Sequence, residues 1–196
     1  MNDYNFIRTV IPAEAFKDVE TVNGLTFAHF GEKMLDGMDA YECAECSTPS
    51  GEFVLADAKA AYEVWKSGME AAELSGKKRE KIAEIDAYDT SDKVNGFTLN
   101  GVTVWLDKAT RVGLMNSTTI AKNMGQTETT VWFGGVRLTI KCDEAIQLLS
   151  ALEMYALQCF NVTAAHKKAV MGLATAEEVE KYDVTAGYPS QINIKV

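Results

Sequence analysis

Two short turns constrain the fold of this chain more than any other feature of its sequence. Each turn lies between two segments of alternating apolar residues: Asn100-Gly101 between residues 97–99 and 102–104, and Gly134-Gly135 between residues 131–133 and 136–138. Both positions of a two-residue hairpin turn need positive φ, which Gly and Asn adopt more readily than other residues. The sequence therefore predicts two β-hairpins.

Each predicted hairpin leads into an acidic residue and then a helical segment. Asp107 precedes Lys108-Ala109-Thr110, and Asp143 precedes Glu144-Ala145-Ile146. An Asp at the N-cap accepts a hydrogen bond from an unpaired backbone N–H, and its charge suits the positive end of the helix dipole. We therefore expect two β-hairpin-plus-helix units, with Asp107 and Asp143 as N-caps.

The helix after Asp143 is expected to be long and to carry both hairpins on its apolar face. Residues at alternating spacings of three and four mark this face: Leu149, Leu152, Ala156, Cys159, Thr163, His166 and Val170. The helix should end near Gly172, as its C-cap. Thr175 and Glu178 then fit a capping box that opens a short last helix, and residues 192–196 alternate like a strand.

The first part of the chain is expected to form a small α/β module. Val22-Asn23-Gly24-Leu25 predicts one more hairpin, and the spacing of apolar residues from Leu55 predicts an amphipathic helix with Asp57 as a possible cap. We expect that helix to break at Gly76 and a second one to follow over residues 77–87. The predicted fold class is α+β, with a module over residues 1–76 and a C-terminal domain over residues 77–196.

Composition limits the classes of partner. The 196 residues carry a formal net charge of -9, which repels nucleic-acid phosphates. The basic run of Lys77, Lys78, Arg79 and Lys81 is interrupted by Glu80, so it is read as the solvated face of a helix. The start of the chain has no basic leader, and no apolar stretch approaches the roughly 20 residues of a membrane helix. We therefore expect no nucleic acid or membrane partner, and a cytoplasmic or virion-associated protein.

Two arrangements of cysteine invite a chemical interpretation. Cys43 and Cys46 have the spacing of a metal knuckle or a redox motif, but no second ligand pair accompanies them, and ordinary reduced thiols are expected. Cys159 and His166 share a helical stripe, yet seven residues amount to roughly 10 Å of rise, too far for a direct hydrogen bond. We interpret this pair as core, with His166 near the negative end of its helix.

No familiar catalytic signature occurs in the sequence. It contains no glycine-rich phosphate loop, no Gly-x-Ser-x-Gly elbow and no His-Glu-x-x-His zinc helix. The acidic pairs Asp143-Glu144 and Glu177-Glu178 lie where helix starts favour negative charge. The expectation is a protein that is not an enzyme and needs no cofactor or metal.

Four segments between Lys77 and about Met171 are informative together: Lys78-Arg79-Glu80-Lys81-Ile82, Phe97-Thr98-Leu99-Asn100-Gly101, Trp105-Leu106-Asp107-Lys108-Ala109-Thr110-Arg111 and Ala165-His166-Lys167-Lys168-Ala169. They resemble an uncharacterised domain of phage and prophage tail-fibre-related proteins. The resemblance implies a structural or assembly accessory protein of phage origin. It supplies no residue with an assigned role.

A docking surface is predicted on the reverse faces of the two hairpins. Trp105 lies on one, and Trp132 and Arg137 lie on the other, and Trp and Arg are enriched at interface hot spots. The alternative is that a second helix layer covers both indoles as core. The expected function is a non-enzymatic tail-associated protein that binds a tail component or itself. The alternative is an intracellular hydrolase or ligand-binding protein with a site in the N-terminal half.

Overall fold

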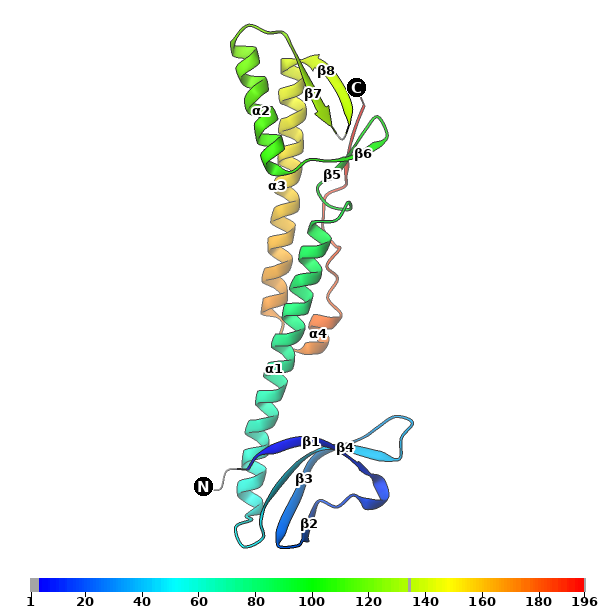
Figure 1. Cartoon of the computed structure of the whole chain (residues 1–196), viewed down its shortest axis with the longest axis vertical. Coiled ribbons are helices and arrows are strands. Elements are labelled where there is room, and N and C mark those ends of the chain that lie inside the picture. Colours follow the sequence, from blue (N-terminus) through cyan, green and yellow to red (C-terminus); the bar gives the residue numbers. More distant parts are fainter. Residues whose placement is uncertain (1–3, 134, 196) are drawn as a thin grey trace. The chain divides into compact units, whose positions relative to one another are not determined.

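The computed structural model describes residues 4–133 and 135–195 and has the predicted mixed α+β architecture (Figure 1). The chain divides into two compact units, Met1–Glu73 and Leu74–Val196. Helix α1 (Leu55–Asp89) contributes its first part to one unit and its second part to the other. No helix in the described part of the chain is long and apolar enough to cross a membrane.

The N-terminal unit is built on an antiparallel sheet with the strand order β1-β4-β3-β2. Its elements are β1 (Phe6–Pro12), the short 3-10 helix η1 (Ala13–Ala15), β2 (Val19–Val22), β3 (Leu25–Met34) and β4 (Ala40–Pro49). The predicted turn at Asn23-Gly24 joins β2 to β3, and both residues have positive φ, 52° and 79°. The hairpin prediction is confirmed.

One face of this sheet packs against the first part of α1. Phe6, Ala44 and Cys46 from the sheet are buried with Ala58 from the helix, and Tyr62 packs against them. The Tyr62 hydroxyl lies where a β-carbon at residue 31 would sit, 1.9 Å away, so the close approach of helix and strand requires glycine there.

Helix α1 runs through Gly76, so the predicted break there is wrong. A glycine inside a helix costs only about 1 kcal/mol relative to alanine, and the flanking residues are good helix formers. The helix begins at Leu55, which places Asp57 in its first turn rather than at its cap.

The basic run on α1 is only partly a solvated face, because Arg79 is exposed but two of its lysines contact helix ends. The Lys78 ammonium donates to the Met171 carbonyl at 2.8 Å, and the Lys81 ammonium donates to the Glu180 carbonyl at 3.3 Å. These carbonyls belong to the last turns of α3 and α4, where backbone oxygens lack helical partners and the dipole favours cations. The two lysines therefore stabilise helix ends.

The C-terminal unit contains both predicted hairpins. Its elements, after the second part of α1, are β5 (Gly96–Leu99), β6 (Val102–Trp105), α2 (Lys108–Asn123), β7 (Glu128–Phe133), β8 (Val136–Lys141), α3 (Cys142–Gly172), α4 (Ala176–Glu180) and β9 (Ile192–Ile194). Asn100 and Gly101 have φ of 50° and 82°. Gly135 has φ of 86°, and Gly134 lies outside the described residues.

Both hairpins pack on the first half of α3, as expected. The shared core joins one face of each hairpin to the helix and consists of Phe97, Leu99, Val104, Leu106, Val131, Phe133, Leu149 and Leu152. Hairpin pairing places Val102 on the same face as the buried Leu99, yet Val102 is 49% exposed, because it lies directly after the turn.

The second half of α3 packs against α1 and the segment around α4. Ile85, Val170, Val179 and Val184 form a buried cluster there. The capping box of Thr175 and Glu178 is confirmed at the start of α4. Strand β9 pairs in parallel with β5, an arrangement that the alternation of residues 192–196 did not indicate; Val196 lies outside the described residues.

The two predicted N-caps differ. The Asp107 carboxylate accepts from the Thr110 backbone N–H at 2.8 Å, which confirms this cap. Helix α3 begins at Cys142 with Lys141 at the N-cap position, so Asp143 lies in the first turn and pairs with Lys122, and the prediction for Asp143 is wrong. Gly172 is the last helical residue of α3 rather than its cap.

Candidate functional site

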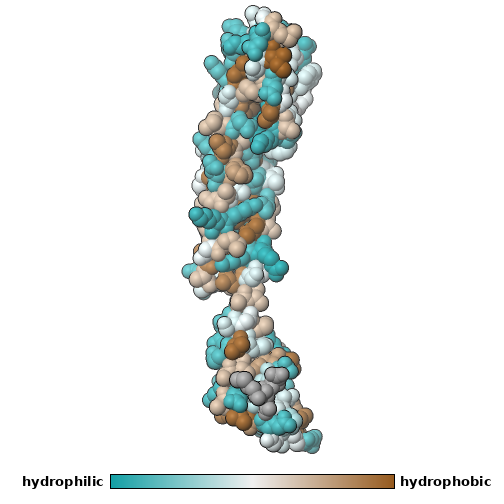
Figure 2. Space-filling model, turned by 90° about the vertical axis from the view of Figure 1, so that its left-hand side faces the viewer, coloured by the Kyte–Doolittle hydropathy of each residue, from teal (hydrophilic) through white to brown (hydrophobic). Residues whose placement is uncertain are grey.

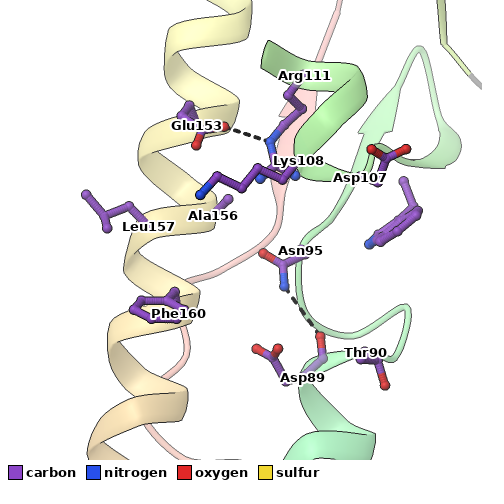
Figure 3. Close-up of a pocket in the computed structure, with 11 residues that line it drawn as sticks. Asp89, Thr90, Asn95, Asp107, Lys108, Arg111, Glu153, Ala156, Leu157 and Phe160 are labelled. Carbon is purple, nitrogen blue, oxygen red and sulfur yellow. Dashed lines mark hydrogen bonds and ion pairs between the residues drawn. The ribbon is translucent and has the colours of Figure 1, made fainter. Parts of the chain in front are cut away.

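A groove in the C-terminal unit is the candidate functional site (Figure 3). It has a volume of about 400 Å³ and is lined by the end of α1, the loop that follows, strand β6, the start of α2 and the middle of α3. We call it the Trp105 groove, after the indole on one of its walls. The volume is within the range of small-ligand pockets, about 300–1000 Å³.

The groove forms because two helices pack against different halves of α3. Helix α2 lies beside the first half of α3, and the second part of α1 lies beside the other half (Figure 1). Helix α1 ends at Asp89 and α2 begins at Lys108, so neither covers the face of α3 that carries Ala156 and Phe160. The surface of α3 around Ala156 and Phe160 is left as the floor and one wall of the groove.

Most polar side chains of the groove are engaged within the protein. The Arg111 Nε donates to Glu153 at 2.9 Å, and its Nη1 donates to the Leu106 carbonyl at 2.6 Å. Asp107 accepts from the side chain and backbone of Thr110, and these hydrogen bonds lower the pKa of its carboxyl below the ordinary value. Arg111 therefore joins α2 to α3 and to the residue after β6, while Asp107 caps α2.

Asp89 links three parts of the unit at the edge of the groove. The Thr163 hydroxyl donates to its carboxylate at 2.6 Å, so the Thr163 oxygen is the acceptor for the Tyr188 hydroxyl at 2.8 Å. The side chain of Asn95 donates to the Asp89 carbonyl at 3.4 Å (Figure 3). Burial raises the pKa of Tyr188, which keeps its donor proton in place.

Lys108 is the exception among the charged residues of the groove. Its side chain extends from the first turn of α2 across the groove towards α3 (Figure 3). Among the described residues, its ammonium has neither a hydrogen bond nor an ion pair, whereas Arg111 beside it has both. An unpaired cation therefore points into the groove.

Large apolar side chains stand exposed around this cation. Trp105 is 56% exposed, Leu157 is 49% exposed and Phe160 is 66% exposed. Leu157 and Phe160 lie outside the buried stripe of α3, and this position was the signal in the sequence that they are exposed. The sequence did not show what surrounds them, because that depends on where α1 ends and α2 begins. Sequence reasoning identified Trp105 and missed Lys108, Leu157 and Phe160.

The structure does not bring the three predicted docking residues into one groove. Trp132 and Arg137 lie opposite each other across the β7–β8 hairpin, and neither is among the described residues that line the Trp105 groove. Trp132 is 59% exposed, so neither indole is core, and the alternative of a second helix layer over both is wrong. Their part in binding stays a prediction.

The thiols of the N-terminal unit do not form a chelating pair. Cys43 and Cys46 lie three residues apart on β4, so their side chains point to opposite faces of the sheet. Both are free and buried, and burial raises the pKa of each thiol. Within the described residues, no group of three or more His, Cys, Asp or Glu side chains is placed to hold a metal ion.

The two histidines are fully occupied within the described structure. In the N-terminal unit, the ring nitrogens of His29 face the Lys17 carbonyl and the Glu45 carboxylate. In the C-terminal unit, the Nε2 of His166 donates to the Ala186 carbonyl at 2.8 Å, so in the neutral ring Nδ1 accepts from the Tyr182 hydroxyl. His166 is buried well inside α3 rather than at its end, which corrects that interpretation.

Comparison with known proteins places most of the C-terminal unit in a family. Residues 76–186 match the family described as Domain of unknown function (DUF4376), and the groove lies inside the matched region. The comparisons with curated proteins and with solved structures found no match. Because the matched segment covers more than half of the chain, the protein belongs to the DUF4376 family.

Proposed function

We propose that this chain is a non-enzymatic, phage or prophage tail-associated protein that acts in particle assembly or as a minor structural component. The resemblance of residues 77–171 to a domain of tail-fibre-related proteins supports the biological context. The Trp105 groove supports the molecular role, which is binding of a protein partner.

One observation carries the proposed role. Trp105, Leu157 and Phe160 stand exposed around a concave surface in which the neighbouring carboxylates and guanidinium are already engaged. Exposed aromatic side chains in a concavity are typical of interface hot spots, because a partner can bury them fully. This combination favours the capture of a partner over chemistry on a substrate.

The state of the histidines favours the same role. A general base must have a nitrogen or carboxylate free to take a proton from a substrate. In His29 and His166, both ring nitrogens already contact protein groups. In the N-terminal unit, His29 is held between a backbone carbonyl and a carboxylate, which favours a structural role for it.

Purified particles test this proposal. The full chain, carrying an affinity tag, would be expressed in the cells that encode it, and tail particles and their assembly intermediates would be separated on a density gradient. We expect the chain to sediment with particles or intermediates. A double variant, Trp105→Ser with Phe160→Ser, should abolish co-sedimentation.

The matched control replaces the other exposed tryptophan, Trp132. Trp132→Ser removes a tryptophan of similar exposure outside the groove, and we expect it to weaken co-sedimentation less. Thermal melts of all variants would establish that they fold. The proposal fails if the folded wild-type chain is absent from both particles and intermediates.

A further inference from the structure

We infer that the Trp105 groove binds a peptide segment of a partner protein in which an acidic side chain lies next to a large apolar one. This inference rests on the proposed partner-binding function and names the chemistry of the partner.

The apolar requirement follows from the walls of the groove. Trp105 lines the groove from the end of β6, and Leu157 and Phe160 line it from α3. All three side chains are about half exposed or more. Figure 3 shows Leu157 and Phe160 on α3. An aromatic or aliphatic side chain placed between them would remove apolar surface from water on both sides. The volume of about 400 Å³ accommodates a large side chain with part of its backbone.

The acidic requirement follows from Lys108. It is the one lining cation in the described groove that has no protein partner, because Arg111 is held by Glu153 and the Leu106 carbonyl. A carboxylate that reaches Lys108 would gain a charge-assisted hydrogen bond in a partly enclosed site. Asp89, on the α1 side, would repel that carboxylate and so fix the direction in which the peptide lies.

The state of the other polar groups disfavours a saccharide. A sugar presents many hydroxyls and needs several free hydrogen-bonding side chains around an aromatic platform. Here Asp107 accepts from Thr110, and Arg111 donates to Glu153 and to a backbone carbonyl. In the described lining, Lys108 is the cation without a protein partner, and it stands among exposed apolar side chains, which matches an acidic-apolar peptide better.

A second copy of the chain is a weaker fit for the groove. On the face of the C-terminal unit shown in Figure 2, hydrophobic residues lie among hydrophilic ones rather than in one continuous area. Stable homodimers usually bury a large and predominantly apolar patch.

The test uses the indole N–H signals of the full chain. The sequence contains three tryptophans, so a proton–nitrogen NMR spectrum resolves the groove, through Trp105, from two internal references, Trp65 and Trp132. The probe is a short glycine-flanked peptide with adjacent glutamate and phenylalanine. Its counterparts carry lysine in place of glutamate, or alanine in place of phenylalanine.

We expect saturable movement of the Trp105 signal with the glutamate–phenylalanine peptide and little movement of Trp65 and Trp132. Lys108→Glu should weaken this binding at least about tenfold, equivalent to about 1.4 kcal/mol, and should favour the lysine counterpart. Lys168→Glu is the matched control, because Lys168 is an exposed lysine on α3 outside the groove lining. It should leave the affinity unchanged.

Several outcomes would overturn the inference. One is equal affinity for the lysine counterpart. Another is movement of the Trp105 signal with maltohexaose but with none of the peptides. A third is movement of that signal with protein concentration alone, which would assign the groove to a second copy. Co-sedimentation with particles without peptide binding would leave the proposed function standing and reject this inference. Peptide binding without co-sedimentation would reject the proposed function and leave the peptide specificity of the groove standing.

Discussion

The two hairpin-plus-helix units look alike in sequence and differ in how strand passes into helix. In the first, β6 ends at Trp105 and two residues intervene before α2, so Asp107 is free to adopt the extended conformation of an N-cap. In the second, β8 runs to Lys141 and α3 begins at the next residue. Asp143 is then already helical.

Cys142 accounts for this early start. Its backbone N–H donates to the Thr127 carbonyl at 2.9 Å, and its thiol contacts the Gln126 carbonyl at 3.4 Å. The loop after α2 thus fixes the first residue of α3 and satisfies a donor that a cap would otherwise serve. The comparison teaches that an Asp before a helix predicts a cap only where the preceding strand leaves it room.

The largest effect should come from the core that the two hairpins share. Phe97 and Phe133 are fully buried and contact edge to face, with ring centroids 6.1 Å apart. We expect Phe97→Ala and Phe133→Ala each to reduce the free energy of unfolding by about 3–5 kcal/mol, measured by urea titration. Val102→Ala, at an exposed position, is the control. A large loss for only one phenylalanine would show that the hairpins do not share one core.

A smaller effect separates the two ends of α2, each of which pairs with α3. Arg111 has a side chain that is 11% exposed and contacts Glu153, whereas Lys122 is 49% exposed and pairs with Asp143. Arg111→Met should reduce stability by about 1.5–3 kcal/mol, because a partly buried charged hydrogen bond is lost. Lys122→Met should change stability much less. Equal losses in urea titration would contradict this ranking.

Substitution of the two aspartates tests the comparison directly. Asp107→Ala removes a cap and should lower the midpoint of thermal unfolding, while Asp107→Asn should restore most of it, because Asn caps equally well. Asp143→Ala removes only an exposed ion pair and should lower the midpoint less. If Asp143→Ala were the more harmful change, the assignment of caps would be reversed.

The smallest effect is expected in acid. Hydrogen bonds from Thr110 lower the pKa of Asp107 in the folded state, so its contribution to stability is present above the ordinary Asp pKa of about 3.9. That contribution is lost as the pH falls through the lower folded value. Unfolding midpoints of Asp107→Asn should therefore fall less steeply below this pH than those of the wild type. If the midpoints of the two proteins fell in parallel with pH, protonation of Asp107 would not contribute to the loss of stability in acid.

The local part of the fold could be predicted because turns, caps and helical faces depend on neighbouring residues. The Asn-Gly turns, the cap at Asp107, the capping box at Thr175 and most of the buried stripe of α3 were predicted correctly. The exception in the stripe is Ala156, which lines the groove, while Tyr155 beside it is buried. The continuity of α1 and the parallel pairing of β9 could not be, because each depends on contacts between residues far apart in the chain.

The candidate site shows the same division. Trp105 could be identified because hairpin alternation places it on the outer face. The groove around it arises where α1 ends and α2 begins against α3, and no local pattern specifies that junction. The role of Lys108 could not be predicted for a different reason. Whether a cation is paired depends on every side chain that can reach it.

The sheet that contains the first hairpin is completed only when strand β9, near the end of the chain, has been synthesised. Its partner β5 leaves the ribosome far earlier, so the outer edge of β5 has no strand beside it until residues 192–194 appear. An open edge of this kind can pair with another chain. Residues 76–186, which define the family match, stop short of β9, so a fragment cut to those limits would present that edge and be prone to aggregate.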